Sequence, residues 1–298
     1  MKIWYCVFLL AGGVLLTGCA GHSVSEPDFH DPSALSYVNA HGVSVEVRLP
    51  SEGFVTASMV IDVKTAQNAM QTSDTLTRSA VNAGGLVGLL AASAINTRTG
   101  VGALERDARA SAQNDARPMA ALLEDQSLQD VLQRRYREAS QAAGLKQAQG
   151  SISARLLITA QLVLSGDRSH FVLVNRVQVQ DIAGSVLYQR RIEVLGKPFR
   201  RCGEQCMDDG RLDQARVNDQ LQVCIAEAMR VLTQDLNVTD SRFSREETIR
   251  YVLDGQRIVE RGQQLPASDG YHRYRNLDGA LKSVPVAFEN ATGETTLP

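Results

Sequence analysis

Three cysteines in the second half of the chain, Cys202, Cys206 and Cys224, are the residues whose type and spacing most suggest chemistry. The first two lie in a charged segment (RRCGEQCMDDG), and Cys224 falls on the apolar side of a predicted helix. In an oxidising compartment these thiols favour one structural disulfide, either Cys202 with Cys206 or one of them with Cys224. A metal site is the alternative, but three thiolates without a nearby histidine form an incomplete ligand set. The Cys-x-x-x-Cys spacing also differs from the Cys-x-x-Cys of redox-active pairs.

An apolar segment at the N-terminus ends in another cysteine, Cys19. Met1 and Lys2 give the chain a short positive start, and residues 3–16 (IWYCVFLLAGGVLL) are apolar. This run is shorter than the roughly 20 residues that a membrane-spanning helix needs, and its length is typical of a secretory signal peptide. The sequence therefore predicts an export signal over residues 1–18.

The residues Leu16-Thr17-Gly18-Cys19 resemble the lipobox of bacterial lipoproteins, in which a small residue precedes the cysteine that receives a diacylglyceryl group. The resemblance implies cleavage before Cys19 and acylation of both its thiol and the new amino terminus. Several acyl chains anchor a protein stably, whereas a single chain binds marginally. Ala20 follows the cysteine where an aspartate would retain the protein in the inner membrane, so the resemblance implies the periplasmic face of the outer membrane. The alternative is an ordinary secreted protein in which Cys19 is an incidental thiol.

Residues 83–95 (AGGLVGLLAASAI) form the most unusual stretch of the mature chain. Gly84, Gly88 and Ala92 are spaced by four, so on a helix they would form a smooth face that lets another backbone approach closely. A helix of this length covers about 20 Å, which is too short to cross a hydrocarbon core of about 30 Å. We expect the segment to be buried against the sheet, with membrane-surface contact and self-association as the alternatives.

Motifs and composition argue against several function classes. The sequence contains no Gly-x-Ser-x-Gly, His-Glu-x-x-His, phosphate-loop or Gly-x-Gly-x-x-Gly pattern. Its 31 Lys+Arg and 33 Asp+Glu residues give a formal net charge of -2, which leaves no basic excess for nucleic acid. The five histidines are scattered along the chain. We therefore expect no metal, no cofactor and no nucleic-acid partner.

Period-two apolar patterns predict the strands that must position these groups. The expected strands are residues 43–49 and 54–63, followed by an antiparallel meander over 155–164, 171–179 and 186–194. Asp-Gly pairs at 254–255 and 278–279 predict two further hairpins near the C-terminus.

Helical spacing predicts two helical regions. Residues 104–144 are expected to be mostly helical, with Pro118 in the first turn of a helix that ends at Gly144. A second helix is expected between Arg211 and Leu236, with its apolar stripe facing the sheet and with Glu227 and Asp235 off that stripe.

These elements predict an α+β fold in which an antiparallel sheet packs against two or three helices, with a small C-terminal β-unit. The expected organisation is a signal peptide (1–18), a lipidated tether (19–32), an α/β periplasmic domain (33–240), and the small β-unit with a tail (241–298).

The order of strands, long helix, meander, helix and β-tail resembles envelope lipoproteins with a small α/β periplasmic domain. Examples are the curli-secretion lipoprotein and the lipoproteins that activate penicillin-binding proteins. The first hypothesis is a non-catalytic outer-membrane lipoprotein that serves an envelope complex as an accessory or assembly factor, with an envelope protein as partner and self-association left open. The second hypothesis is a periplasmic hydrolase that acts on cell-wall or lipid material.

Overall fold

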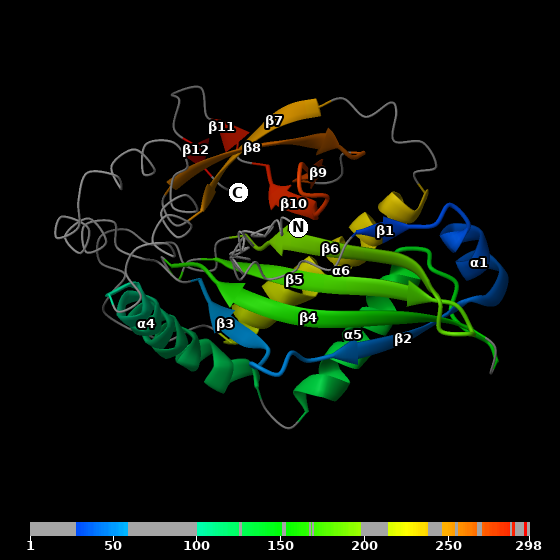
Figure 1. Ribbon diagram of the computed structural model, residues 1–298, viewed down its shortest axis with the longest axis horizontal. Helices are drawn as coiled ribbons and strands as arrows, with labels where there is room; N and C mark the ends of the chain where they lie inside the picture. Colours follow the sequence, from blue (N-terminus) through cyan, green and yellow to red (C-terminus); the bar gives the residue numbers. More distant parts are fainter. Residues whose placement is uncertain are drawn as a thin grey trace, which may run out of the picture.

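The computed structural model describes the chain from Asp28 onward in separate stretches (Figure 1). They comprise residues 28–58, 100–124, 127–150, 153–166, 168, 170–197, 214–237, 246–253, 256–266, 270–286, 288–289 and 295–296. The described part is a mixed α/β structure built on one large, mostly antiparallel sheet with four helices.

The large sheet contains ten of the described strands, in the order β2-β4-β5-β6-β10-β9-β8-β7, with β1 paired to β6 and β3 paired to β4. The strands are β1 (Phe29–His30), β2 (Val43–Arg48), β3 (Val55–Ala57), β4 (Ala154–Leu164), β5 (Phe171–Gln180), β6 (Val186–Leu195), β7 (Glu246–Leu253), β8 (Gln256–Gln264), β9 (Tyr271–Asn276) and β10 (Leu281–Pro285). Parallel pairing joins β2 and β3 to β4, and β10 to β6. Two further strands, β11 (Phe288–Glu289) and β12 (Thr295–Thr296), pair with each other.

The predicted meander is confirmed as β4, β5 and β6, which are joined antiparallel. Along β5, buried residues such as Phe171 and Leu173 alternate with more exposed ones, as expected for a strand with one face in the core. Gly184 lies in the turn between β5 and β6 with φ 88°, a conformation that favours glycine.

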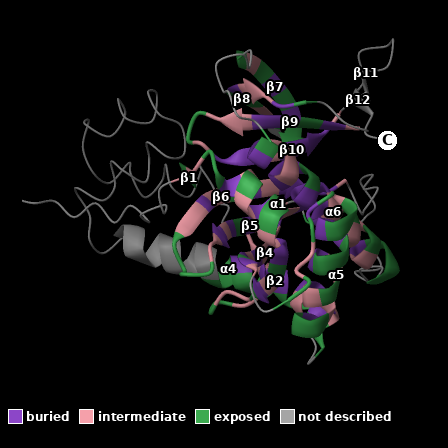
Figure 2. Ribbon diagram, turned by 90° about the vertical axis from the view of Figure 1, so that its right-hand side faces the viewer, coloured by how far each residue is buried: buried purple, intermediate pink, exposed green. Residues whose placement is uncertain are grey.

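The helices are α1 (Ala34–His41), α4 (Gly100–Leu123), α5 (Leu128–Ala142) and α6 (Gln214–Asn237). Figure 2 shows α5 and α6 against one face of the sheet, and α6 closely matches the helix predicted from the sequence. Its apolar stripe is buried as expected, including Leu221, Ile225 and Leu232. Within the described residues, no helix is both long and apolar enough to cross a membrane.

The predicted position of Pro118 is wrong. Pro118 lies inside α4 rather than in a first turn, and the next helix, α5, begins at Leu128. A proline inside a helix removes one backbone hydrogen bond and costs about 3 kcal/mol or more. Ala116, Met119 and Leu123 of the same helix are buried in the core, and their packing offsets this cost.

Two features differ from the expected organisation. The C-terminal strands β7 to β10 do not form a separate unit, because Leu281 of β10 pairs in parallel with Ile192 of β6 and so extends the main sheet. The expected tether also ends too late, since Phe29 and His30 already pair with Gln189 and Tyr188 of β6. Both features depend on pairings between distant residues, which periodicity within one segment does not reveal.

Candidate functional site

Most residues that the sequence singled out lie outside the described part of the chain. They are Cys19, Gly84, Gly88, Ala92, Cys202 and Cys206, and their assignments remain predictions. Cys224 is described, as a free and fully buried thiol on α6. Burial, with a smaller effect of Glu227, raises the pKa of this thiol well above its ordinary value. Cys224 is therefore an unreactive core residue in this structure, and the pairing of Cys202 with Cys206 stays a prediction.

In the described part of the chain, several polar and aromatic contacts lie together at β1, where the chain first joins the sheet. Asp31 fastens the end of β1 because its backbone N–H donates to the carbonyl of Leu187, 2.8 Å away. The His30 ring packs edge-on against Tyr188, with ring centroids 5.4 Å apart. The carboxylate of Asp28 forms an ion pair with Arg190, at 3.2 Å between Oδ2 and Nη1. A strand of two residues is thus held by a backbone bond, a ring contact and an ion pair.

These contacts continue inward to Asp235, a fully buried residue of α6. Its carboxylate accepts a hydrogen bond from Tyr188 Oη at 3.0 Å and another from Arg275 Nη2 at 2.5 Å. Arg190 Nε lies 3.5 Å from the same carboxylate, so Arg190 connects Asp28 to Asp235. Through these contacts, the Asp235 carboxylate on α6 is connected to β6 and β9 directly, and to β1 through Arg190.

The electrostatics favour a neutral His30. Burial lowers the pKa of His30 below its ordinary value and outweighs the opposing attraction of Asp235. The arginines Arg190 and Arg275 act in the same direction as burial. At neutral pH the ring therefore packs on Tyr188 mainly as an uncharged imidazole.

A second buried carboxylate on α6, Glu227, forms a bidentate ion pair whose two side chains are both buried. Arg273 of β9 donates to both of its oxygens, at 2.6 and 2.7 Å, and Ser283 of β10 donates at 2.7 Å. Burial alone would raise the pKa of Glu227, but the hydrogen bonds from Arg273 and Ser283 hold it below its ordinary value. Such bidentate pairs fix geometry as well as charge, so they lock α6 onto the C-terminal strands.

Sequence reasoning missed both carboxylates, because Glu227 and Asp235 lie off the apolar stripe and a charge there is normally solvated. The available signal was in β9, where Arg273 and Arg275 are two residues apart and so share one face of the strand. Two arginines on the buried face of a strand need buried acidic partners.

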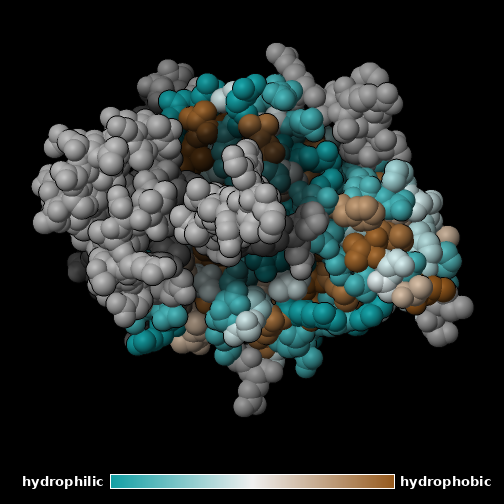
Figure 3. All heavy atoms as spheres, in the orientation of Figure 1, coloured by the Kyte–Doolittle hydropathy of each residue, from teal (hydrophilic) through white to brown (hydrophobic). Residues whose placement is uncertain are grey.

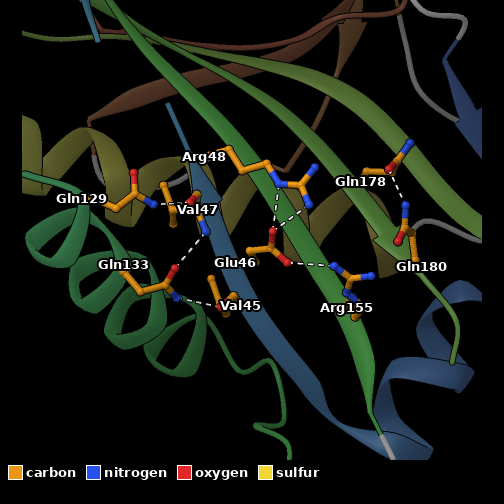
Figure 4. A network of polar contacts seen from close by, with 9 residues as sticks. All are labelled: Val45, Glu46, Val47, Arg48, Gln129, Gln133, Arg155, Gln178 and Gln180. Carbon is orange, nitrogen blue, oxygen red and sulfur yellow. Dashed lines mark hydrogen bonds and ion pairs between the residues drawn. The ribbon is translucent and has the colours of Figure 1, made fainter. Parts of the chain in front are cut away.

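One edge of the sheet is closed by side chains (Figure 4). Gln133 of α5 accepts a hydrogen bond from Val47 N at 2.9 Å and donates to Val45 O at 2.6 Å. Gln129 donates to the carbonyl of Val47. On the open face, Glu46 forms ion pairs with Arg48 and Arg155. Three of the outer backbone groups of β2 that could pair with another strand, Val45 O, Val47 N and Val47 O, are thus occupied by side chains.

Exposed apolar side chains cluster near β1. Phe29 is 46% exposed, Ile182 in the turn between β5 and β6 is 62% exposed, and Leu277 in the turn between β9 and β10 is 71% exposed. Figure 3 shows hydrophobic surface over the end of the molecule that carries β1, α1 and the turn between β5 and β6. We call Phe29, Ile182 and Leu277 the apolar trio.

Contacts made by the two turns with Asp28 and Tyr37 place the trio at one end of the sheet. The turn that holds Leu277 packs on Asp28, since a side chain at Gly279 would collide with the Asp28 carboxylate. Ile182 N donates to Tyr37 Oη of α1 at 3.1 Å, and α1 begins four residues after β1. All three members therefore surround the point where the chain joins the fold, which we call the β1 end.

Comparisons with known proteins give no further assignment. No family model matches the chain, and no match is found among curated proteins or solved structures.

Proposed function

We propose that this protein is a lipoprotein anchored through Cys19 at the periplasmic face of the outer membrane, where it acts non-catalytically as an accessory or assembly factor of an envelope complex. The observation that carries the proposal is the short distance along the chain between the acylation motif and a fixed strand. Eight residues lie between Cys19 and Asp28, and even a fully extended chain over those nine residue-to-residue steps spans at most about 30 Å. The anchor would therefore connect almost directly to β1.

The contacts of β1 suit a strand that bears an anchor. Pairing with β6, the ion pair of Asp28 with Arg190 and the link from Arg190 to Asp235 connect β1 to the core of the fold. A domain held in this way follows its anchor as a rigid body, with a defined end toward the lipid. This supports a role in presenting a surface to an envelope partner.

The state of the buried charges supports binding rather than hydrolysis. Glu227 is engaged by Arg273 and Ser283, and the lowered pKa of its carboxyl keeps it ionised at neutral pH. Asp235 is engaged by Tyr188 and Arg275. A general acid or base needs a proton that is available near the working pH, and these contacts serve to hold elements together instead.

The test is metabolic labelling with radioactive palmitate, followed by fractionation of the cell envelope. The wild-type chain should be labelled and found with the outer membrane, whereas Cys19→Ala should be unlabelled and released to the soluble periplasm. Cys6→Ala is the matched control, because Cys6 lies inside the apolar segment and not in the lipobox-like motif. Equal labelling of wild type and Cys19→Ala would refute the anchor. Release of soluble fragments from cell-wall or lipid material by the purified protein would refute the non-catalytic role.

A further inference from the structure

The β1 end combines two features that are independent of each other. One is the apolar trio, which leaves Phe29, Ile182 and Leu277 exposed around the junction of the chain with the fold. The other is the length of chain between Asp28 and the proposed acylation site at Cys19. We propose that the apolar trio is a lipid-docking surface, which inserts into the membrane interface and fixes the orientation of the domain on the bilayer. This inference rests on the proposed function, because it requires the anchor at Cys19.

Chain length decides which end of the domain faces the membrane. The tether can span at most about 30 Å. The eleven residues of β4 alone extend over about 33 Å, at roughly 3.3 Å for each step from one residue to the next. β4 starts at the β1 end, since Arg155 pairs with Gln180 next to the turn that holds Ile182. The far end of the sheet is thus farther from the β1 end than the tether is long, and the β1 end stays nearest the lipid.

Side-chain direction favours contact with lipid. Phe29 pairs with Gln189 and His30 with Tyr188, so the two residues of β1 point to opposite faces of the sheet. His30 points inward onto the Tyr188 ring, which leaves Phe29 on the side away from the helices. Ile182 and Leu277 lie in turns, and more than half of the surface of each is exposed. Aromatic and aliphatic side chains of this kind insert into the boundary between headgroups and acyl chains.

The charges near the trio identify the kind of lipid contact. Asp31, Asp181 and Asp278 lie beside its members and would be repelled by anionic headgroups. Docking should therefore depend on apolar insertion and proceed on zwitterionic lipid.

The mature chain offers a direct optical test, because the single tryptophan of the sequence, Trp4, lies in the predicted signal peptide and is absent after cleavage. Leu277→Trp in the lipidated protein then gives a unique reporter at the β1 end. Val223→Trp is the matched control, since Val223 is 40% exposed on α6 and lies twelve residues, or about 18 Å along the helix, from Asp235. Both variants should keep the wild-type melting temperature, because both positions are exposed.

The lipidated variants are reconstituted into phosphatidylcholine vesicles with and without brominated acyl chains, which quench tryptophan inside the bilayer. We expect emission from position 277 to fall about twofold in brominated vesicles, because interfacial side chains reach the acyl boundary, and emission from position 223 to stay unchanged. Unquenched emission at position 277, equal quenching at both positions, or quenching that requires phosphatidylglycerol would overturn the inference. Flotation of the same samples separates the two proposals: protein that floats without quenching refutes only the docking surface, and protein that does not float refutes the anchor as well.

Discussion

Replacing Arg273 by leucine should be among the most destabilising single changes in the described part of the chain. Its side chain is 1% exposed and that of Glu227 is 0% exposed, so Arg273→Leu leaves a buried carboxylate without its bidentate partner. Removing one member of a buried ion pair costs roughly 3–5 kcal/mol of unfolding free energy. For a domain of this size, that loss lowers the melting temperature by roughly 6–20 °C. Ser283 and Arg230 still contact Glu227, which favours the lower half of this range.

The assay is urea unfolding of the mature chain at several pH values. In the wild type, Glu227 contributes stability above its ordinary pKa of 4.5, and this contribution is lost as the pH falls through its lower folded pKa. In Arg273→Leu, burial raises the pKa of the unpaired carboxyl, which then takes up a proton more readily. The difference in unfolding free energy between wild type and Arg273→Leu should therefore be largest near pH 7 and should shrink toward pH 4.

The matched control is Arg261→Leu, which removes an exposed ion pair with Glu246. Their side chains are 65% and 51% exposed, and such pairs contribute less than about 1 kcal/mol. If Arg273→Leu cost no more than Arg261→Leu, or if its cost were independent of pH, our reasoning about the buried pair would be wrong.

Three further predictions concern β1, the cysteines and the small-residue segment. Asp235→Asn removes one charged partner of Arg190, so hydrogen exchange at the amide of Asp31, measured by mass spectrometry, should become faster. Exchange in α5 should stay unchanged as the control. The same exchange rate at Asp31 in wild type and variant would contradict the proposed link to β1. Alkylation of the unfolded, unreduced mature protein should modify Cys224 and leave Cys202 paired with Cys206, whereas three alkylated thiols at these positions would exclude a structural disulfide. Gly88→Leu should strain a close helix contact by about 1–3 kcal/mol. If the segment is buried within the domain, thermal melts of the variant should show a lower melting temperature, and gel filtration should show an unchanged oligomeric state. If the segment mediates self-association, gel filtration should show loss of oligomers while the monomer stays folded. No change in either measurement refutes both packing roles.

Local sequence signals were sufficient for the elements that depend on neighbours in the chain. Alternation along β5 and the Asp278-Gly279 pair between β9 and β10 encode a strand and a tight turn within about ten residues. The apolar stripe of α6 is likewise a property of one segment, and its burial was predicted correctly.

The features that sequence reasoning missed depend on distant partners. Glu227 meets Arg273 across 46 positions, and Asp235 meets Arg275 across 40 positions, so each carboxylate looks like an ordinary surface charge within its own helix. The parallel pairing of β10 with β6 has no local signature either, because a parallel strand can be separated from its partner by any crossover. The strand β1 was assigned to the tether because its two residues are too few to show a periodic pattern.

The most direct test of the account is the intact mass of the mature N-terminal peptide, isolated from outer membranes. The account predicts a peptide that begins at Cys19 and carries a diacylglyceryl group on its thiol and a further acyl chain on its amino terminus. A peptide that begins at Ala20, or one that begins with an unmodified Cys19, would contradict the anchor and with it the assigned orientation of the β1 end.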